Sequence, residues 1–290
     1  MNDWWPGYLA TCACWAAPIE RALAGGFAAD RMAWAFSAGY QAALHALVPG
    51  LPDTAMCAFC VTEATGNSPR AIQATLAPDA TKSGLMRLSG HKKWSTLGPQ
   101  SGMLLVAARE AGDDERPRIR LVRVRANAPG LFLQPLPATP FIPEATHAEV
   151  HLENLAVAAT DILDGDGYDA YVKPFRTVED VHINAATMAY LLREARVRRW
   201  PGAWVEQAVA LLATFIDIAG RPADSAVTHV VLAGALRAGA RLVDEADAHW
   251  QDAPADAAAQ RWTRDRVLLG VAQSARDRRI ARAWERLTPT

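Results

Sequence analysis

Residues 57–68 read CAFCVTEATGNS and residues 88–98 read LSGHKKWSTLG, and these two stretches decide the predicted fold. Each contains a short strand-like run beside a turn rich in Gly, Asn or Ser. Further runs of this kind between residues 54 and 157 are AIQATLA, MLLVAARE, RIRLVRVR, LFLQPL and AEVHLENLAV. Short strand-like runs at this spacing predict an antiparallel β-barrel or sandwich.

The chain on both sides of this segment has a helical pattern. Residues 18–47 carry apolar side chains at every third or fourth position, which predicts two short helices broken near Gly25 and Gly26. Beyond Asp166, four amphipathic stretches with short connections predict an antiparallel four-helix bundle, over residues 178–199, 202–219, 226–250 and 255–287.

The predicted class is therefore α+β, in three segments. A reduced N-terminal helical segment covers residues 1–50, a middle β-domain covers residues 51–162, and a C-terminal helical bundle covers residues 163–290.

Composition and charge exclude several classes of protein. The 290 residues include 30 Lys and Arg against 31 Asp and Glu, so a basic surface of the kind that holds nucleic acid or anionic lipid is not expected. The longest apolar stretch, residues 208–216, ends at Asp217 and is shorter than a membrane span. The N-terminus has no Lys or Arg ahead of its apolar part, so no secretory signal is expected. We predict a soluble protein of the reducing cytoplasm.

Two groups of residues resemble metal ligands. Cys12 and Cys14 form C-x-C, and Cys57 and Cys60 form C-x-x-C, but residues three apart in a strand point to opposite faces, so core positions are expected. In HAEVHLE, residues 147–153, the His and Glu side chains share one face of a strand and the apolar ones share the other. We expect a solvent-facing or interface-facing row there and predict no metal site.

The order CVTEATGNSP, LSGHKKWSTLG, LLVAARE resembles the middle domain of the acyl-CoA dehydrogenase family. The family patterns read like C-x-T-E-P-x-A-G-S-D, N-G-x-K-x-W-I-T-N-G and LLVVAR. The later stretch THAEVHLENLAVAATDILDGDGYDAY looks like the family segment that closes the β-domain, and the match keeps one register over residues 38–190. The resemblance implies N-terminal helices, a β-barrel-like domain and a C-terminal four-helix bundle, with FAD between the last two.

The resemblance also implies cofactor-binding positions. Ser68 falls beside both flavin and substrate. The flavin-binding set is Phe59, Val61, Thr62, Ser68, Trp94, Ser95 and Thr96. An indole can cover one face of a flavin, while hydroxyls and backbone N–H groups bind the edge of the ring.

The family reaction removes the α-proton of an acyl-CoA thioester while a hydride leaves the β-carbon for the flavin, so a carboxylate base is needed. Some members carry this Glu in a pattern like L-x-x-E-R-L-x-L-A-A, and VEDVHINAA places Glu179 on it. The alternative is that Thr177 caps a helix restarted after Pro174, which makes Glu179 and Asp180 ordinary first-turn acids. His182, one turn further on, is expected to be a core or interface histidine.

The sequence also departs from the family. Only about fifty residues precede the β-domain, the turn Pro and Asp are replaced in TEATGNSP, and the R-x-x-F-G-x-x-I loop is shortened to RVRRWPGAW. The predicted function is FAD-dependent oxidation of the Cα–Cβ bond of an acyl thioester. The alternative is a degenerate scaffold or acyl-CoA-binding subunit without turnover. Five tryptophans in the bundle predict a homodimer: Trp200, Trp204, Trp250, Trp262 and Trp284.

Overall fold

The computed structural model describes residues 3–112, 117–251 and 256–288. The chain divides into two compact units. The β-unit comprises residues 50–139 and 144–174, and the helical unit comprises the rest of the described chain. The architecture is mixed α+β, as predicted.

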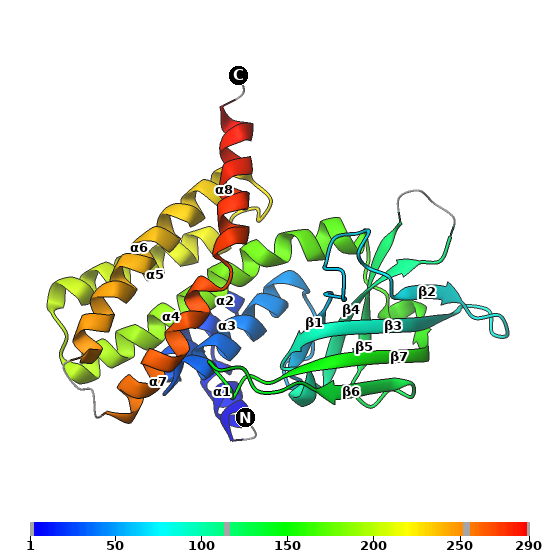
Figure 1. Cartoon of the computed structure of the whole chain (residues 1–290), viewed down its shortest axis with the longest axis horizontal. Coiled ribbons are helices and arrows are strands. Elements are labelled where there is room, and N and C mark those ends of the chain that lie inside the picture. The colour runs from blue at the N-terminus through cyan, green and yellow to red at the C-terminus, as the bar shows by residue number, and fades with distance from the viewer. Residues whose placement is uncertain (1–2, 113–116, 252–255, 289–290) are drawn as a thin grey trace. The chain divides into compact units, whose positions relative to one another are not determined.

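The β-unit contains a seven-stranded sheet (Figure 1). Its strand order is β1-β4-β2-β3-β7-β6, and β5 pairs with the free side of β4. The described pairings follow one path from β1 to β6 rather than a closed ring. The strands are β1 (Cys57–Cys60), β2 (Thr75–Pro78), β3 (Leu85–Thr96), β4 (Met103–Glu110), β5 (Ile119–Arg125), β6 (Leu131–Pro135) and β7 (His147–Ala158).

The expectation of a purely antiparallel sheet is wrong at β4. Strand β1 runs parallel to β4 with Cys57 opposite Met103, and β2 runs parallel to it with Thr75 opposite Arg109. Parallel neighbours need a long connection, and the chain between β1 and β4 supplies one because it contains β2 and β3. The other pairings are antiparallel.

Alternating burial along β7 confirms the predicted strand pattern. Ala148, Val150 and Leu152 are buried, while His147, Glu149 and His151 are half-buried. Val150 and Leu152 join one apolar core, built mainly from residues of β1, β2, β3, β4, β5 and β7. In β1, the side chains of Cys57 and Cys60 are buried as expected, and burial raises the pKa of these thiols to about 12 and about 11.

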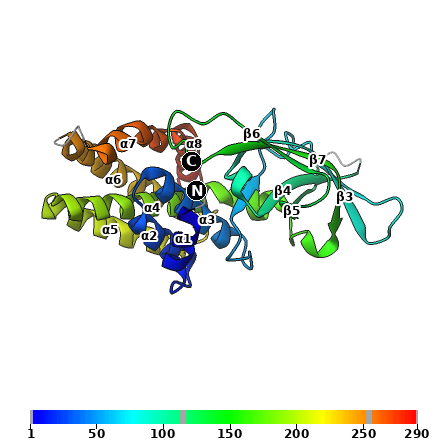
Figure 2. The same cartoon turned by 90° about the horizontal axis from the view of Figure 1, so that it is seen from below.

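The helical unit draws its helices from both ends of the chain. Figure 2 shows them from below. A short 3-10 turn in this unit covers Arg266–Gly270. In the β-unit, 3-10 turns cover Gly98–Gln100 and Ala159–Asp161, and a π-helical turn covers Tyr168–Val172. The helices are α1 (Trp4–Cys12), α2 (Pro18–Ala28), α3 (Met32–Leu47), α4 (Lys173–Arg198), α5 (Gly202–Ala219), α6 (Ala226–Gln251), α7 (Ala257–Asp265) and α8 (Gln273–Leu287).

Two predicted helix boundaries are wrong. Helix α2 continues through Gly25 and Gly26 to Ala28, because these glycines permit close packing rather than a break. A Cβ at Gly26 would collide with the backbone of Ala186 in α4, and one at Gly25 would lie 2.6 Å from the Tyr8 ring. The predicted helix over 255–287 is split into α7 and α8 by the 3-10 turn that ends at Gly270, a poor helix former.

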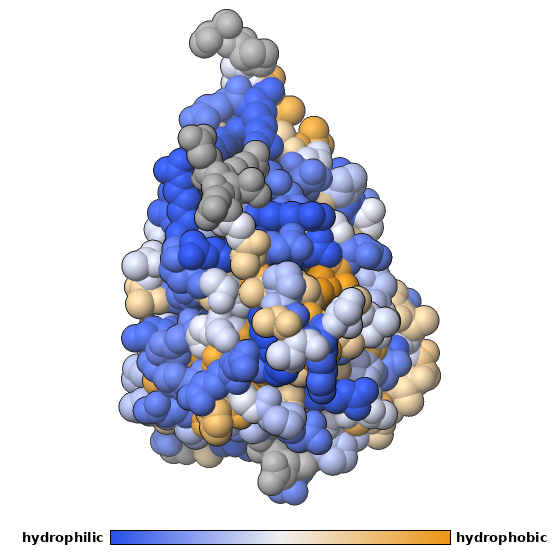
Figure 3. All heavy atoms as spheres, turned by 90° about the vertical axis from the view of Figure 1, so that its right-hand side faces the viewer, coloured by the Kyte–Doolittle hydropathy of each residue, from blue (hydrophilic) through white to orange (hydrophobic). Residues whose placement is uncertain are grey.

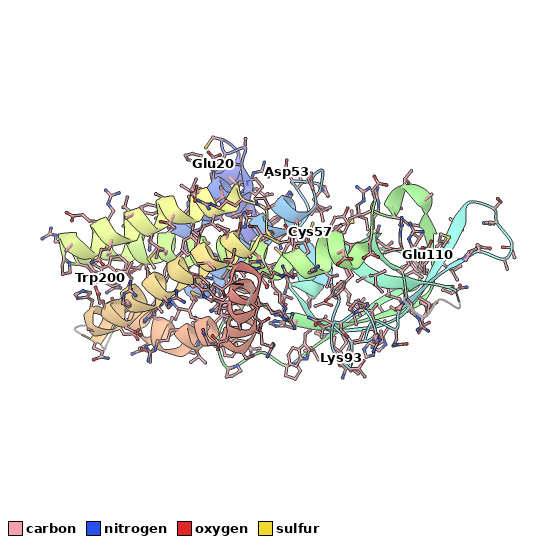
Figure 4. All side chains as sticks on the ribbon, turned by 90° about the horizontal axis from the view of Figure 1, so that it is seen from above. Glu20, Asp53, Cys57, Lys93, Glu110 and Trp200 are labelled. Carbon is pink, nitrogen blue, oxygen red and sulfur yellow. The ribbon has the colours of Figure 1, made fainter. Side chains whose placement is uncertain are left out.

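Most of the bundle tryptophans pack on one another inside the helical unit. Trp200, Trp204, Trp250 and Trp262 are buried, with ring centroids 5.0–6.2 Å apart along the chain of contacts. Trp200 lies between α4 and α5, at the end of these helices (Figure 4). Because only Trp284 is substantially exposed, the tryptophans do not supply the surface for a partner that the sequence suggested.

Helices α5 and α6 are long and apolar enough to cross a membrane, judged by length and composition alone. Of the 18 residues in the most apolar stretch of each helix, only 28% in α5 and 22% in α6 are buried within the described chain. Large apolar side chains on their exposed sides are Val209, Ile216 and Val227. These helices therefore carry apolar surface that the described part of the chain does not cover.

Candidate functional site

A buried ion pair shapes the turn that follows β1. Glu63 and Gly66 exchange two backbone hydrogen bonds of 2.8 and 3.0 Å, and Gly66 has φ +123°, which favours glycine. The Glu63 carboxylate accepts hydrogen bonds from the backbone N–H groups of Gln73 (2.9 Å) and Ala74 (3.0 Å). The Nζ of Lys92 lies 2.6 Å from Glu63 Oε1.

This ion pair ties the two decisive sequence stretches together. Lys92 is fully buried and Glu63 is nearly so. Burial lowers the pKa of Lys92, and the Glu63 carboxylate opposes that shift. The sequence analysis did not single out either residue. The family patterns do mark both positions: Glu63 is the Glu of T-E, and Lys92 is the Lys of K-x-W.

A β-bulge in β3 controls how Trp94 is presented. Lys93 and Trp94 stand opposite the single residue Glu149 of β7, between the paired positions Lys92 and Ser95. Trp94 has φ +55°, an uncommon conformation for a bulky residue, and 57% of its surface is exposed. Bulges of this kind redirect side chains and occur beside functional sites.

Thr62 and Thr96 accompany Trp94 in the β-unit. The backbone N–H of Lys93 donates to the carbonyl of Thr62 over 2.7 Å, which brings the two predicted flavin segments into contact. Thr96 is half-buried and stands opposite His147 in the ladder. The His147 ring meets the Trp94 ring edge to face, with centroids 5.9 Å apart, and burial lowers the pKa of His147.

Four other predicted flavin residues lie elsewhere in the β-unit. Phe59 and Val61 are buried, and Ser95 is fully buried with its hydroxyl beside the Cys60 thiol. Their side chains belong to the interior. Ser68 is exposed in the turn after β1, where its carbonyl accepts the N–H groups of two later residues of that turn.

The residues around Trp94 fit a flavin. The ring of a flavin needs an aromatic surface to cover one face, and polar groups at its edge. The exposed indole of Trp94 offers the first, and the half-buried Thr62 and Thr96 offer the second. The bulged backbone leaves polar groups of Lys93 and Trp94 outside the β3–β7 ladder.

In the helical unit, α4 carries the predicted base. The alternative in which Glu179 and Asp180 are first-turn acids is wrong, because α4 begins at Lys173 and has no acid in its first turn. The π-helical turn ending at Val172 leads directly into α4, and Pro174 is its second residue, where proline is tolerated.

The environment of Glu179 makes its carboxyl titrate near neutral pH. The side chain is half-buried. Burial, and after it the neighbouring Asp180 carboxylate, raises the pKa of Glu179 to about 7, against the opposing charges of Arg176 and Arg276. A carboxyl group with this pKa can accept a proton at physiological pH, as a general base must.

Asp180 and His182, the neighbours of Glu179, have structural partners. Arg276 binds Asp180 Oδ1 through Nε (3.0 Å) and Nη2 (2.7 Å), and Arg279 binds Oδ2 at 2.8 Å, which joins α4 to α8. His182 is buried, with Nδ1 2.8 Å from the Val178 carbonyl, and burial lowers its pKa to about 4. His182 is therefore a neutral core histidine.

A cavity of about 500 Å³ lies within the helical unit. Residues of α4, α6 and α8 line most of it, with Asn184 the lining residue nearest to Glu179 in sequence. The wall is mixed, because it includes apolar side chains such as Phe215 and Leu236 beside Arg276 and Arg279.

The β-unit carries a sequence match to a known protein family. Residues 58–155, which run from β1 into β7, match the model of the acyl-CoA dehydrogenase middle domain. The β-unit is therefore similar to the middle domain of acyl-CoA dehydrogenases. No curated protein sequence matches this chain significantly.

Solved structures with the same fold extend the similarity over nearly the whole chain. TdsC from Paenibacillus sp. A11-2, solved with FMN and indole, has a TM-score of 0.72 at 16% identity, covering 93% of this chain and 83% of that one. Butyryl-CoA dehydrogenase from Megasphaera elsdenii has a TM-score of 0.67 at 16% identity, and the match covers 92% of this chain and 81% of that one. A probable acyl-CoA dehydrogenase from Mycobacterium abscessus has a TM-score of 0.62 at 14% identity, and the match covers 97% of each chain. At these identities the likeness concerns the fold.

Proposed function

We propose that this protein is an FAD-dependent oxidoreductase that acts on the Cα–Cβ bond of an acyl thioester, with Glu179 as the base. The observation that carries the proposal is the pKa of Glu179, which burial raises to about 7, at the position on α4 where the resemblance to some acyl-CoA dehydrogenases places their base. When bound, the flavin would accept the hydride from the β-carbon. We also propose that the protein works in the reducing cytoplasm.

The chain's own residues would bind the flavin, remove the proton and contact the substrate. Trp94 would cover one face of the flavin ring, and the Thr62 and Thr96 hydroxyls with nearby backbone N–H groups would bind its edge. The Glu179 carboxylate would take the α-proton, and partial burial keeps its proton affinity high enough to do so. Exposed Ser68 is the proposed substrate contact on the β-unit.

Reconstitution and substrate reduction test the proposal. Purified protein is incubated with FAD and, separately, with FMN, desalted, and examined by visible absorption. Loaded protein is then mixed anaerobically with acyl-CoA thioesters of short, medium and long chain length. We expect FAD to be retained and its absorption to bleach with at least one thioester. Protein that retains neither flavin would contradict the proposal.

Variants test the role of Glu179. Glu179→Gln should retain flavin and bleach at least about 100-fold more slowly than the parent, since loss of a general base typically costs 10²–10⁴-fold. Glu206→Gln makes the same change at an exposed position of α5 and should bleach at the parent's rate. Flavin that is retained but never bleached, even in the parent, would favour the scaffold or acyl-CoA-binding alternative.

We further propose that the protein forms a homodimer through the helical unit. The uncovered apolar sides of α5 and α6, which include Val209, Ile216 and Val227, support this proposal. Light scattering at micromolar concentration should give twice the chain mass of 31.3 kDa. Ile216→Asp should shift the mass toward the monomer, and a monomeric parent would refute the proposal.

A further inference from the structure

Three potential metal ligands meet on the β-unit. His91 of β3 stands directly opposite His151 of β7, and Glu149 lies two residues before His151 on the same strand. Figure 1 shows the two strands side by side. Residues two apart in a strand project from the same face, so all three side chains leave the sheet on one side. Figure 3 shows the face of the molecule that lies on the right-hand side of Figure 1, and hydrophilic residues predominate on it.

The donor atoms of these side chains converge. His91 Nε2 lies 2.8 Å from Glu149 Oε2, and His151 Nε2 lies 4.0 Å from the same oxygen. The two imidazole rings are stacked, with centroids 4.2 Å apart and planes at 15°. One donor atom from each of the three residues lies within 4.8 Å of the other two.

The spacing matches the requirements of a metal ion. Ligand atoms about 2.0–2.2 Å from a tetrahedral Zn²⁺ lie roughly 3.3–3.6 Å from one another, between the 2.8 and 4.0 Å that separate the His91 and His151 nitrogens from Glu149 Oε2. Small side-chain rotations would therefore suffice. The backbones are already held, because β3 and β7 are paired on both sides of these residues.

The chemistry of the donors favours a transition metal over Ca²⁺ or Mg²⁺. Two imidazole nitrogens and one carboxylate oxygen form a set that Zn²⁺ accepts, with a fourth position left for water. The side chains of His91, Glu149 and His151 are 40%, 20% and 39% exposed, so an ion can reach them from solution. Lys93 Nζ, 3.5 Å from Glu149 Oε1, is the cation that an ion would displace (Figure 4).

We propose that His91, Glu149 and His151 bind a divalent transition-metal ion, with Zn²⁺ the best fit. His147, which contacts Trp94, is four residues from His151 along β7, about 13 Å away at the rise of a strand. Glu149 itself stands opposite the bulge that contains Trp94, so the metal site borders the proposed flavin residues on the same pair of strands. An ion bound here would link β3 to β7 and stabilise the β-unit.

Calorimetric titration of tag-free protein with Zn²⁺ tests the proposal. We expect one ion per chain for the parent. Glu149→Gln and His151→Ala should each weaken binding at least about 10-fold. Glu153→Gln removes the same charge from an exposed position of β7 outside the cluster and should bind as the parent does. Equal binding by the parent and both cluster variants would overturn the assignment.

Two further measurements separate this site from alternatives. Co²⁺ bound at the site should show the visible bands of nitrogen and oxygen ligation without a thiolate charge-transfer band, and such a band would assign the ion to cysteine and overturn the proposal. Circular dichroism of each variant without metal should match the parent. Zn²⁺ should raise the melting temperature of the parent and of Glu153→Gln, but not that of His151→Ala; a rise in all three would count against the site.

Discussion

The raised pKa of Glu179 predicts that Glu179→Gln becomes more stable relative to the parent as pH rises. The pKa of this carboxyl lies at about 7 in the folded protein against an ordinary value of 4.5. Between these values the folded state holds a proton that the unfolded state has released. The stabilising contribution of Glu179 is therefore fully present below pH 4.5 and is lost as pH rises through 7.

The magnitude follows from the size of the shift. A shift of about 2.5 pH units at about 1.36 kcal/mol per unit corresponds to about 3 kcal/mol, an upper bound because the half-buried carboxyl keeps part of its hydration. Glutamine does not titrate. The free energy of unfolding of Glu179→Gln minus that of the parent should therefore increase by up to 2–3 kcal/mol, in order of magnitude, between pH 5 and pH 8.

Urea denaturation followed by tryptophan fluorescence measures this difference in the helical unit. Nine of the ten tryptophans belong to that unit, and Trp94 alone belongs to the β-unit. His182, whose pKa burial lowers to about 4, contributes stability that is lost as pH falls, but it is present in both proteins and cancels. Glu206→Gln, which makes the same change at an exposed position of α5, is the matched control. A difference for Glu179→Gln that stays within about 0.5 kcal/mol from pH 5 to pH 8 would refute the reasoning.

Three further predictions concern packing and cofactor binding. Lys92→Met should lower the free energy of unfolding by about 3–5 kcal/mol in urea denaturation, because it leaves Glu63 buried without its cation, and adding Glu63→Gln should recover part of the loss. Gly26→Ala should lower the melting temperature because its Cβ meets α4, whereas Gly234→Ala, with open space around it, should raise it slightly; the opposite order would contradict the packing. Trp94→Ala should weaken flavin binding about 10-fold by fluorescence titration without changing the melting temperature of the unliganded protein, since the ring is exposed; unchanged affinity would exclude Trp94 from the site.

Local pattern alone determined the α+β class and the strand over residues 147–153. The alternation in HAEVHLE reports which face of β7 meets the apolar core, and the structure shows that alternation in the burial of Ala148, Val150 and Leu152. Helix-period stretches likewise gave α5 with its bounds. These properties depend on neighbours within a few residues, so a sequence contains them directly.

The candidate site depended on both sequence motifs and tertiary structure. The resemblance to the family pattern placed Glu179 at the base position, but whether Glu179 was a first-turn acid depended on where α4 begins, and the preceding π-helical turn decides that. The flavin positions followed from the matched motifs, yet only the bulge in β3 shows that Trp94 is exposed while Ser95 is buried. The Glu63–Lys92 ion pair joins residues 29 positions apart.

Tertiary structure alone decided which strands pair and in which direction. The parallel pairing of β1 and β2 with β4 leaves no local mark, because a strand's periodicity is the same whichever neighbour it has. His91 and His151 became neighbours through the register of β3 and β7, so one of the three proposed metal ligands, His91, lies outside the HAEVHLE pattern. Gly25 and Gly26 read as a helix break in sequence, yet they allow α2 to approach its neighbours closely. In each case the deciding interaction joins residues far apart in the chain, and its energy exists only once the chain has folded.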